Sequence, residues 1–180
     1  MDNSTSFLIE PSGLPAALAA GAVLLDVRPG DEFMHGHIPG AVPFTTYEVF
    51  VPNSSLDAMK EFAEAMVRRF STAGVNSERE VIVYDDDTGK FAARELWILE
   101  YLGHRRARML HGGFRQWKAE GGPVSADTEI PTVRTKKVQL SVASGCFAGA
   151  SEVARRLGTR NFSAIDVRSD REWTGNDATP

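Results

Sequence analysis

The stretch Ala22-Val23-Leu24-Leu25-Asp26-Val27-Arg28 is an apolar run that ends in one acidic and one basic residue, and a similar run ends in Ile165-Asp166-Val167-Arg168. An acidic and an aromatic residue follow each copy, at Glu32-Phe33 and at Glu172-Trp173. The two aspartates lie 140 residues apart (166 minus 26), which is the length of a domain. An internal repeat with this period predicts two similar domains in tandem.

Short apolar runs alternate with helical patterns in the first copy. The strand-like runs cover residues 23–27, 41–44, 81–84 and 107–110. Helical patterns cover 14–20, 56–70 and 90–102, and a shorter amphipathic helix begins at Gly112-Gly113. Such alternation is typical of an α/β fold in which helices cover both faces of a parallel sheet. The sequence predicts this fold for a first domain over residues 8–123.

The second copy is expected to be incomplete. The pattern of the first copy continues from Asp26 to Trp117, whereas only 14 residues follow Asp166. Residues 124–136 show little periodicity and are expected to form a linker. Residues 137–180 are then the start of a second domain. They contain a helical pattern over 150–157 and a strand-like run over 163–167 whose apolar side chains lack a partner sheet.

Composition and charge exclude several classes of protein. The 180 residues carry 20 basic and 24 acidic side chains, a net charge of −4, and no basic cluster exceeds the one at 104–108, so we expect no nucleic-acid partner. No apolar run reaches the roughly 18 residues that span a bilayer, and we expect no membrane partner. The N-terminus has no signal-peptide pattern and the single Cys146 cannot form an internal disulfide, which favours a cytoplasmic protein.

Five further motifs follow Asp26-Val27-Arg28 along the chain. They are Gly36-His37-Ile38-Pro39-Gly40-Ala41, Val81-Ile82-Val83-Tyr84-Asp85, Ala92-Ala93-Arg94, Leu102-Gly103-His104, and Leu110-His111-Gly112-Gly113-Phe114 with Trp117. In order and spacing, over roughly residues 14–120, this series resembles the rhodanese family. The resemblance implies a rhodanese-like α/β domain followed by an incomplete second copy. Such a tandem is similar to the two-domain thiosulfate and 3-mercaptopyruvate sulfurtransferases.

The resemblance also implies a chemistry. Such enzymes move a sulfane sulfur from a small anionic donor, thiosulfate or 3-mercaptopyruvate, to cyanide or a thiol through a Cys persulfide, with no cofactor. The Cys directly follows the strand that corresponds to 81–84, where backbone N–H groups stabilise the anionic sulfur. Asp85 occupies this position here, and a carboxylate cannot carry a persulfide. The first domain is therefore expected to be inactive, with the Asp85 carboxylate itself accepting the loop's N–H groups.

The nucleophile is expected beyond Pro180, in the remainder of the second domain. Cys146 precedes the first strand of the second copy, where no such loop follows, and a structural role is expected for it. Arg168 and Arg171 are predicted to bind the anionic donor, because the second domains of the resembled enzymes place cationic groups in this region. Glu172 is the alternative residue for the position of Arg171.

The other candidate residues are interpreted as structural. They are Asp26, Arg28, His37, Gly40, Arg94 and Asp166. Asp26 and Arg28 are expected to form an ion pair or loop anchor, with one side chain on each side of the strand end. His35, His104 and His111 also lie at the boundaries of elements. The consecutive carboxylates Asp85-Asp86-Asp87 are not expected to bind a metal, because Asp87 or Thr88 is a natural N-cap for the helix that follows.

Two alternative functions follow from the same motifs. One is a non-catalytic rhodanese-like module that binds a protein or an anion and serves regulation. A second Gly-His-Ile-Pro-Gly motif and a Cys-led loop after Pro180 would favour the enzyme instead. The other alternative is a rhodanese-related phosphatase, which needs a Cys-led loop that ends in an arginine such as Arg94. Asp85 removes the nucleophile and excludes it.

Overall fold

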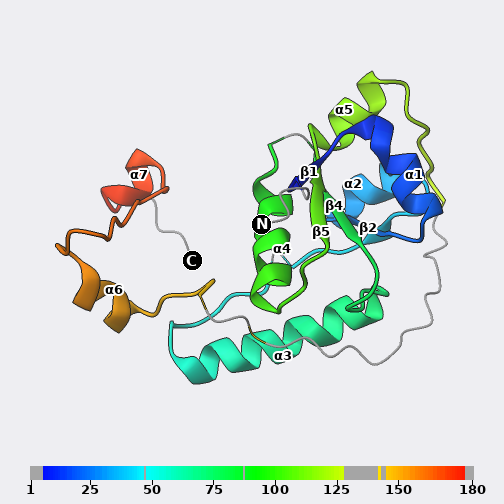
Figure 1. Ribbon diagram of the computed structural model, residues 1–180. Coiled ribbons are helices and arrows are strands. Elements are labelled where there is room, and N and C mark those ends of the chain that lie inside the picture. The colour runs from blue at the N-terminus through cyan, green and yellow to red at the C-terminus, as the bar shows by residue number, and fades with distance from the viewer. Residues whose placement is uncertain (1–5, 47, 87, 128–141, 143–144, 177–180) are drawn as a thin grey trace. The chain divides into compact units, whose positions relative to one another are not determined.

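The computed structural model describes residues 6–46, 48–86, 88–127, 142 and 145–176. Two compact units divide the chain, residues 1–147 and residues 148–180 (Figure 1). In the part of the chain that is described, no helix combines the length and the apolar character needed to cross a membrane.

The first unit contains a five-stranded parallel sheet in the order β1-β5-β4-β2-β3. Its strands are β1 (Leu8–Ile9), β2 (Val23–Asp26), β3 (Val42–Pro43), β4 (Val81–Tyr84) and β5 (Ala107–Leu110). β4 lies in the centre, and all four of its residues are buried, as are the four of β2. A central parallel strand is covered on both faces, which explains why Val81-Ile82-Val83-Tyr84 is continuously apolar.

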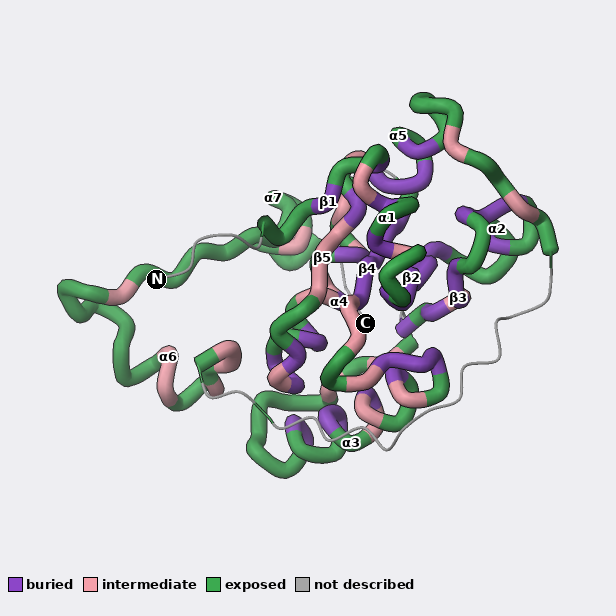
Figure 2. Tube along the Cα trace, turned by 45° about the vertical axis from the view of Figure 1, so that its right-hand side comes forward, coloured by how far each residue is buried: buried purple, intermediate pink, exposed green. Residues whose placement is uncertain are grey.

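Helices cover both faces of the sheet, as the sequence predicts. α3 (Leu56–Thr72) and α4 (Lys90–Tyr101) share one core with alternate residues of β2 and β4, including Leu25 and Val83. Four further helices come before α3 or after α4 in the sequence. They are the 3-10 helix η1 (Pro11–Gly13), α1 (Leu14–Ala19), α2 (Gly30–His35) and α5 (Gly113–Ala119). Leu14, Phe33 and Trp117, from α1, α2 and α5, belong to a second core. Figure 2 shows these three helices grouped on the other side of the sheet from α3 and α4.

Three short elements of the first unit, namely β1, η1 and α2, are absent from the predicted set. β1 has only two residues, and its partner β5 lies about a hundred residues further along the chain. α2 is a six-residue helix that buries only Phe33. Beyond Pro123, Ser125 forms an antiparallel bridge with His37, and the compact unit extends to Phe147. The domain boundaries at 123 and 137 stay predictions.

The described residues of the second unit, 148–176, form two short helices, α6 (Ala150–Arg156) and α7 (Asp170–Trp173). The helix expected over 150–157 is therefore present. The strand expected over 163–167 is wrong, because no strand is formed there and the side chains of Ile165 and Val167 are 82% and 92% exposed. A strand needs a hydrogen-bonded neighbour, and the described residues of this unit offer none.

Candidate functional site

The candidate site lies at the carboxyl ends of β2 and β4, which are neighbours in the sheet. Asp26 and Tyr84, the last residues of the two strands, are register partners. The loops that follow them therefore start side by side. In open parallel sheets ligands bind in the crevice outside the carboxyl ends of the strands, so these loops are the first place to look for chemistry.

Asp85 follows β4, and its carboxylate is directed at the start of α4. Its Oδ1 accepts the backbone N–H of Gly89 at 3.0 Å, and its Oδ2 accepts those of Phe91 at 3.1 Å and Ala92 at 3.4 Å. Asp85 is only 3% exposed. The first N–H groups of a helix have no partner within the helix and favour negative charge, so a carboxylate satisfies them well. The predicted hydrogen bonds from the loop to Asp85 are confirmed.

The N-cap of α4 differs from the prediction. Gly89 is the N-cap residue, with a φ of 72°, and it makes no side-chain cap. Thr88 accepts the Lys90 N–H only at 3.4 Å, and Asp87 lies outside the described residues. Asp85 performs the capping from further back in the chain, because the left-handed turn at Gly89 brings the helix N–H groups over its carboxylate.

The start of α5 holds the same loop from the other side. The backbone carbonyl of Asp85 accepts the N–H of Phe114 at 2.8 Å, and that of Asp86 accepts the N–H of Arg115 at 2.9 Å. A Cβ at Gly113 would lie 2.6 Å from both carbonyl oxygens. Only glycine permits this close approach, which explains why Gly113 stands here. The Asp85 loop is therefore fixed by two helix N-termini.

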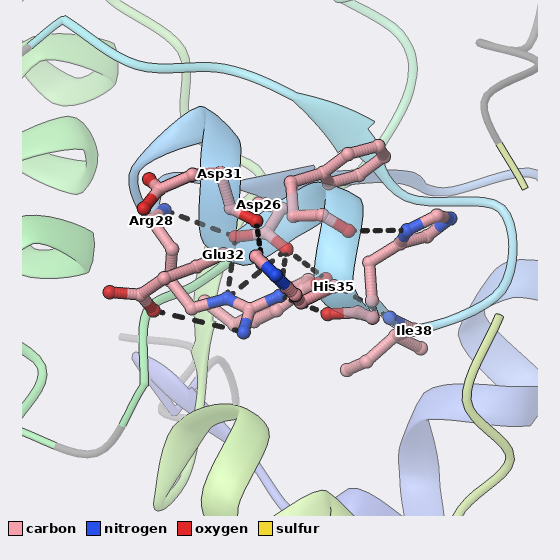
Figure 3. A network of polar contacts seen from close by, with 10 residues as sticks. Asp26, Arg28, Asp31, Glu32, His35 and Ile38 are labelled. Atoms are coloured by element: carbon pink, nitrogen blue, oxygen red, sulfur yellow. Dashed lines mark hydrogen bonds and ion pairs between the residues drawn. The ribbon is translucent and has the colours of Figure 1, made fainter. Parts of the chain in front are cut away.

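Beneath this loop, Asp26 and Arg28 form a buried ion pair (Figure 3). Asp26 Oδ1 accepts from the Arg28 backbone N and Nε, both at 3.0 Å, and Oδ2 accepts from Arg28 Nη2 at 2.6 Å. The predicted ion pair is confirmed, but its two side chains do not lie on opposite sides of the strand end. Residues two apart point the same way, which lets the two groups meet. Arg28 Nη2 also donates to the carbonyl of Gly36 at 2.8 Å.

Tyr84 completes this network. Its hydroxyl donates to Asp26 Oδ2 at 2.6 Å and accepts the backbone N–H of Ile38 at 3.1 Å. Burial, and then the negative charge of Asp26, raise the pKa of Tyr84 far above its ordinary value. The hydroxyl therefore stays protonated and keeps donating. Tyr84 directly precedes Asp85, so the network fixes the point at which the loop leaves the sheet.

The remaining first-copy candidates lie in structural positions. His37 is buried, stacks on Phe33 with ring centroids 3.8 Å apart, and places Nδ1 3.1 Å from the carbonyl of Phe33. Gly40 has a φ of 82°, which favours glycine in the turn before β3. Arg94 donates to the carbonyl of Thr46 at 3.0 Å and to that of Val49 at 2.7 Å, so it anchors the loop after β3.

Glu95, beside Arg94, is a buried carboxylate that the sequence analysis missed. Its Oε1 accepts from the hydroxyl of Thr46 and from Arg94 Nη1, the latter at 3.2 Å, while its Oε2 has no hydrogen-bond partner. Burial raises the pKa of Glu95, although Thr46 and Arg94 oppose the shift. The only sign of this buried carboxylate in the sequence is that Glu95 stands at a position of the helical pattern that faces the core.

Two open cavities flank the loops, and neither favours an anion. One, of about 460 Å³, contains Arg69 together with Glu48. The other, of about 350 Å³, contains Arg28 and Lys118 together with Glu32 and Asp86. In each, carboxylates balance the cationic side chains, so an anionic donor gains little net attraction. No group of three or more His, Cys, Asp and Glu suited to a metal ion occurs among the residues that the structure describes.

Cys146 lies beside α4. Its backbone carbonyl accepts the indole N–H of Trp97 on α4 at 3.0 Å, and the next residue, Phe147, contacts Tyr101 edge to face. The residue is partly buried and is not in a disulfide. The described residues 145–149 around it form no helix or strand, and a structural role for Cys146 stays a prediction.

In the second unit, Asp166 and Arg168 form an exposed ion pair with an Nη2–Oδ2 distance of 2.7 Å. The hydrogen bonds from Arg168 lower the pKa of Asp166, and the bonds to Asp166 raise the pKa of Arg168. Glu172 closes a capping box with Ser169 at the start of α7. The backbone carbonyl of Arg171 accepts the N–H of Asn176 at 2.8 Å. A donor-binding role for Arg168 and Arg171 stays a prediction.

The fold and the motifs define an α/β domain with a loop built to hold an anionic group after its central strand. Residues 10–120 match the family model described as Rhodanese-like domain. The chain belongs to the rhodanese family.

The relatives of this chain include named sulfurtransferases. It is 33% identical over 176 residues to a thiosulfate sulfurtransferase of Azotobacter vinelandii, covering 96% of this chain and 63% of that protein. It is 28% identical over 151 residues to the 3-mercaptopyruvate sulfurtransferase of Homo sapiens, covering 83% of this chain and 50% of that protein. The chain thus spans about half to two thirds of the length of these relatives.

Solved structures share the fold. SseA from Escherichia coli aligns with a TM-score of 0.63 at 22% identity, over 84% of this chain and 62% of that one. The 3-mercaptopyruvate sulfurtransferase from Leishmania major aligns with a TM-score of 0.63 at 19% identity, over 79% of this chain and 42% of that one. At this identity the likeness establishes the rhodanese fold.

Proposed function

We propose that this chain is the N-terminal, non-catalytic part of a tandem sulfurtransferase. The complete protein moves a sulfane sulfur from thiosulfate or 3-mercaptopyruvate to cyanide or a thiol. The nucleophile is a Cys beyond Pro180, in the remainder of the second domain. Family membership and the named sulfurtransferases among the relatives support this assignment.

One observation carries the proposal, namely the Asp85 carboxylate in the loop after β4. It takes the N–H groups of Gly89, Phe91 and Ala92, the donors that an anionic sulfur would need. A carboxylate is a poor sulfur nucleophile, and this one already accepts the N–H groups that a second anion in the loop would need. Catalysis in this protein therefore needs another loop, and the second Asp-Val-Arg copy at 166–168 indicates where such a domain begins.

The chemistry has two steps. A Cys thiolate attacks the outer sulfur of thiosulfate, a new S–S bond forms, and sulfite leaves with the electron pair of the bond that breaks. Cyanide then attacks the outer sulfur of the persulfide, thiocyanate forms, and the thiolate returns with the electron pair of the second S–S bond. Backbone N–H groups that face the sulfur stabilise its negative charge in both states.

The test compares two polypeptides in thiocyanate formation from thiosulfate and cyanide. One is the 180-residue chain, and the other continues beyond Pro180 through a complete second domain. The proposal expects activity only in the longer protein, with its loss when the Cys of the second Cys-led loop is changed to Ser. Cys146→Ser is the matched control and should leave the activity of the longer protein unchanged.

Two outcomes would overturn the proposal. Thiocyanate formation by the 180-residue chain that disappears in Cys146→Ser would move the nucleophile into this chain. A longer protein without transfer from either donor would favour the alternative, a non-catalytic rhodanese-like module that binds a protein or an anion. For that module an anion site at Asp85 is disfavoured, because the carboxylate already holds the loop's N–H groups.

A further inference from the structure

A third cavity, of about 440 Å³, lies between β3 and α3 and is called the β3–α3 groove below. β3 is the last strand in the order of the sheet, so the groove lies at a sheet edge (Figure 2). One wall is the segment 42–45, which contains β3. The other wall is the set Arg68, Arg69, Thr72 and Ala73 at the end of α3, whose spacing of i, i+1, i+4 and i+5 places them on one face of the helix. None of these residues belongs to the Asp85 loop or to the Asp26–Arg28–Tyr84 network, so the groove is a separate feature.

The two walls are held together by direct contacts. Phe44 stacks on Phe70 of α3, with ring centroids 4.6 Å apart, and both side chains are buried. Arg69 Nη1 also donates to the backbone carbonyl of Thr45 at 2.9 Å. The groove is therefore formed before any ligand arrives, which lowers the entropy that binding would cost.

The groove joins an apolar surface to positive charge. Val42, Phe44 and Ala73 contribute apolar side chains, and Arg68 and Arg69 contribute two guanidinium groups. No carboxylate occurs among the described residues that line it, whereas carboxylates balance the cationic side chains in the two cavities beside the candidate site. Of these three cavities, the β3–α3 groove is therefore the one that attracts an anion.

Arg68 supplies the charge that is left for a ligand. Its guanidinium forms no ion pair or hydrogen bond with the described residues, Glu64 one helical turn earlier included. Arg69 is partly balanced from its other side. It shares the neighbouring cavity with Glu48, and its charge acts against the rise that burial causes in the pKa of Glu95.

A further strand is a poor occupant of this edge. Pro43 is one of the two residues of β3, and it has no N–H to donate to an added strand. A proline on an edge strand protects that edge from strand addition. The groove therefore suits a ligand that is bound through side chains.

We propose that the β3–α3 groove binds a free small molecule in which an anionic group is joined to an apolar body, such as an arylalkyl carboxylate. The anionic group pairs with Arg68 and Arg69, and the apolar body covers Val42 and Phe44. A cavity of about 440 Å³ lies in the range of small-molecule sites. This inference does not depend on the proposed function, because no residue of the candidate site takes part in it.

The experiment titrates the 180-residue chain with 4-phenylbutyrate and follows the backbone amide signals by NMR. We expect saturable shifts at Thr45, Thr72 and Ala73, with a Kd of about 1 mM for a ligand of this size. 4-Phenylbutyramide has the same apolar body without the charge, and it should bind at least about 3-fold more weakly in low salt. Salt at about 0.5 M should remove most of this difference, because it screens the ion pair.

Three variants locate the site. Arg68→Gln should weaken the binding of 4-phenylbutyrate by about 2- to 5-fold, the effect of one exposed ion pair, and leave the binding of the amide unchanged. Arg105→Gln is the matched control, since it removes the same charge at an exposed position outside the groove, and it should bind as the parent does. Thr72→Tyr puts a large side chain into the groove at the exposed end of α3 and should abolish the shifts, while a dispersed amide spectrum shows that the variant folds.

Each of three results would overturn the inference. The first is the lack of saturable shifts at the groove up to about 10 mM 4-phenylbutyrate. The second is an equal Kd for the carboxylate and the amide in low salt, which would mean that the groove does not recognise the anion. The third is an equal effect of Arg68→Gln and Arg105→Gln, which would assign the attraction to the overall charge of the protein.

Discussion

Asp85 Oδ2 lies 3.1 Å from the backbone N of Phe91, so a carboxylate at the end of β4 closes the first turn of α4 from six residues away. The hydrogen bond is part of a buried set of three that uses both carboxylate oxygens. In this domain the backbone N–H groups of the loop after the central strand are thus bound by the carboxylate of Asp85.

Asp85→Ala should destabilise the first unit by about 2 kcal/mol, because hydrogen bonds to a charged group are lost and buried N–H groups are left without a partner. Urea unfolding followed by tryptophan fluorescence measures the loss. The exposed Asp86 is the matched control, and Asp86→Ala should change the stability by less than about 0.5 kcal/mol. Similar losses in the two variants would show that the Asp85 carboxylate is not what holds the loop.

Asp85→Cys should form a persulfide slowly and should not make the 180-residue chain an efficient sulfurtransferase. The neighbouring carboxylates of Asp86 and Asp87 should raise the pKa of the new thiol and repel an anionic donor. Intact mass after exposure to thiosulfate reports the persulfide, and thiocyanate formation reports turnover. Adding Asp86→Asn should accelerate both readouts. A single variant as fast as natural sulfurtransferases would contradict the expected repulsion.

The sequence predicts the centre of this fold better than its edges. β4 is readily predicted because a strand buried on both faces is continuously apolar. β1 has two residues, and its pairing with β5 joins opposite ends of the domain, which no local pattern encodes. The run at 163–167 has the composition of a strand, but Ile165 is exposed and no neighbouring strand pairs with it.

The residues of the candidate site were also predictable only in part. The role of Asp85 could be predicted from the family resemblance, because Asp85 occupies the position of the persulfide-bearing Cys and a carboxylate there can accept the same backbone N–H groups. Tyr84 could not, since it occupies the last place of an apolar run and only the register of β2 with β4 brings its hydroxyl to Asp26. That Asp26 and Arg28 form an ion pair could be predicted. That both side chains lie on the same side could not, because this depends on the turn at the strand end.

Gly113→Ala should be far more destabilising than Gly121→Ala. Both glycines have positive φ, 59° and 79°, so both variants bear a backbone penalty of about 1 kcal/mol. Only at Gly113 would the new Cβ also lie 2.6 Å from the carbonyl oxygens of Asp85 and Asp86, whereas nothing lies within 4 Å at Gly121. We expect a total loss of about 3 kcal/mol for Gly113→Ala. Equal melting temperatures for the two variants would refute the close contact.

His104 should make the first unit less stable in mild acid. Its Nε2 lies 3.0 Å from the carbonyl of Asn76 and its Nδ1 accepts the Arg106 N–H at 3.3 Å, an arrangement that suits the neutral ring. Burial lowers the pKa of His104. The unfolded chain therefore binds the proton first as the pH falls below about 6.5, and stability is lost from there down to the folded pKa, by at most about 1.4 kcal/mol per pH unit.

Unfolding free energies at pH 7.5 and 5.5 test this. His104→Gln should be less stable than the parent at pH 7.5 but should lose less on acidification. The exposed His35 is the control, and His35→Gln should follow the parent at both pH values. An acid-induced loss in His104→Gln equal to that of the parent would assign the pH dependence to other groups.

Glu95 should have the opposite pH dependence. Burial raises the pKa of its carboxyl above the unfolded value, so the folded protein binds the proton more tightly. Stability is then lost as the pH rises from the unfolded pKa of Glu95, about 4.5, to its folded pKa. Above that range the carboxylate is ionised, and its Oε2 has no hydrogen-bond partner. The stability of Glu95→Gln relative to the parent should therefore rise between pH 4.5 and pH 7.5, by at most about 1.4 kcal/mol per pH unit. Glu61→Gln, on the exposed side of α3, should show a constant difference from the parent over that range. A constant difference for Glu95→Gln as well would mean that Arg94 and Thr46 fully offset the burial of the charge.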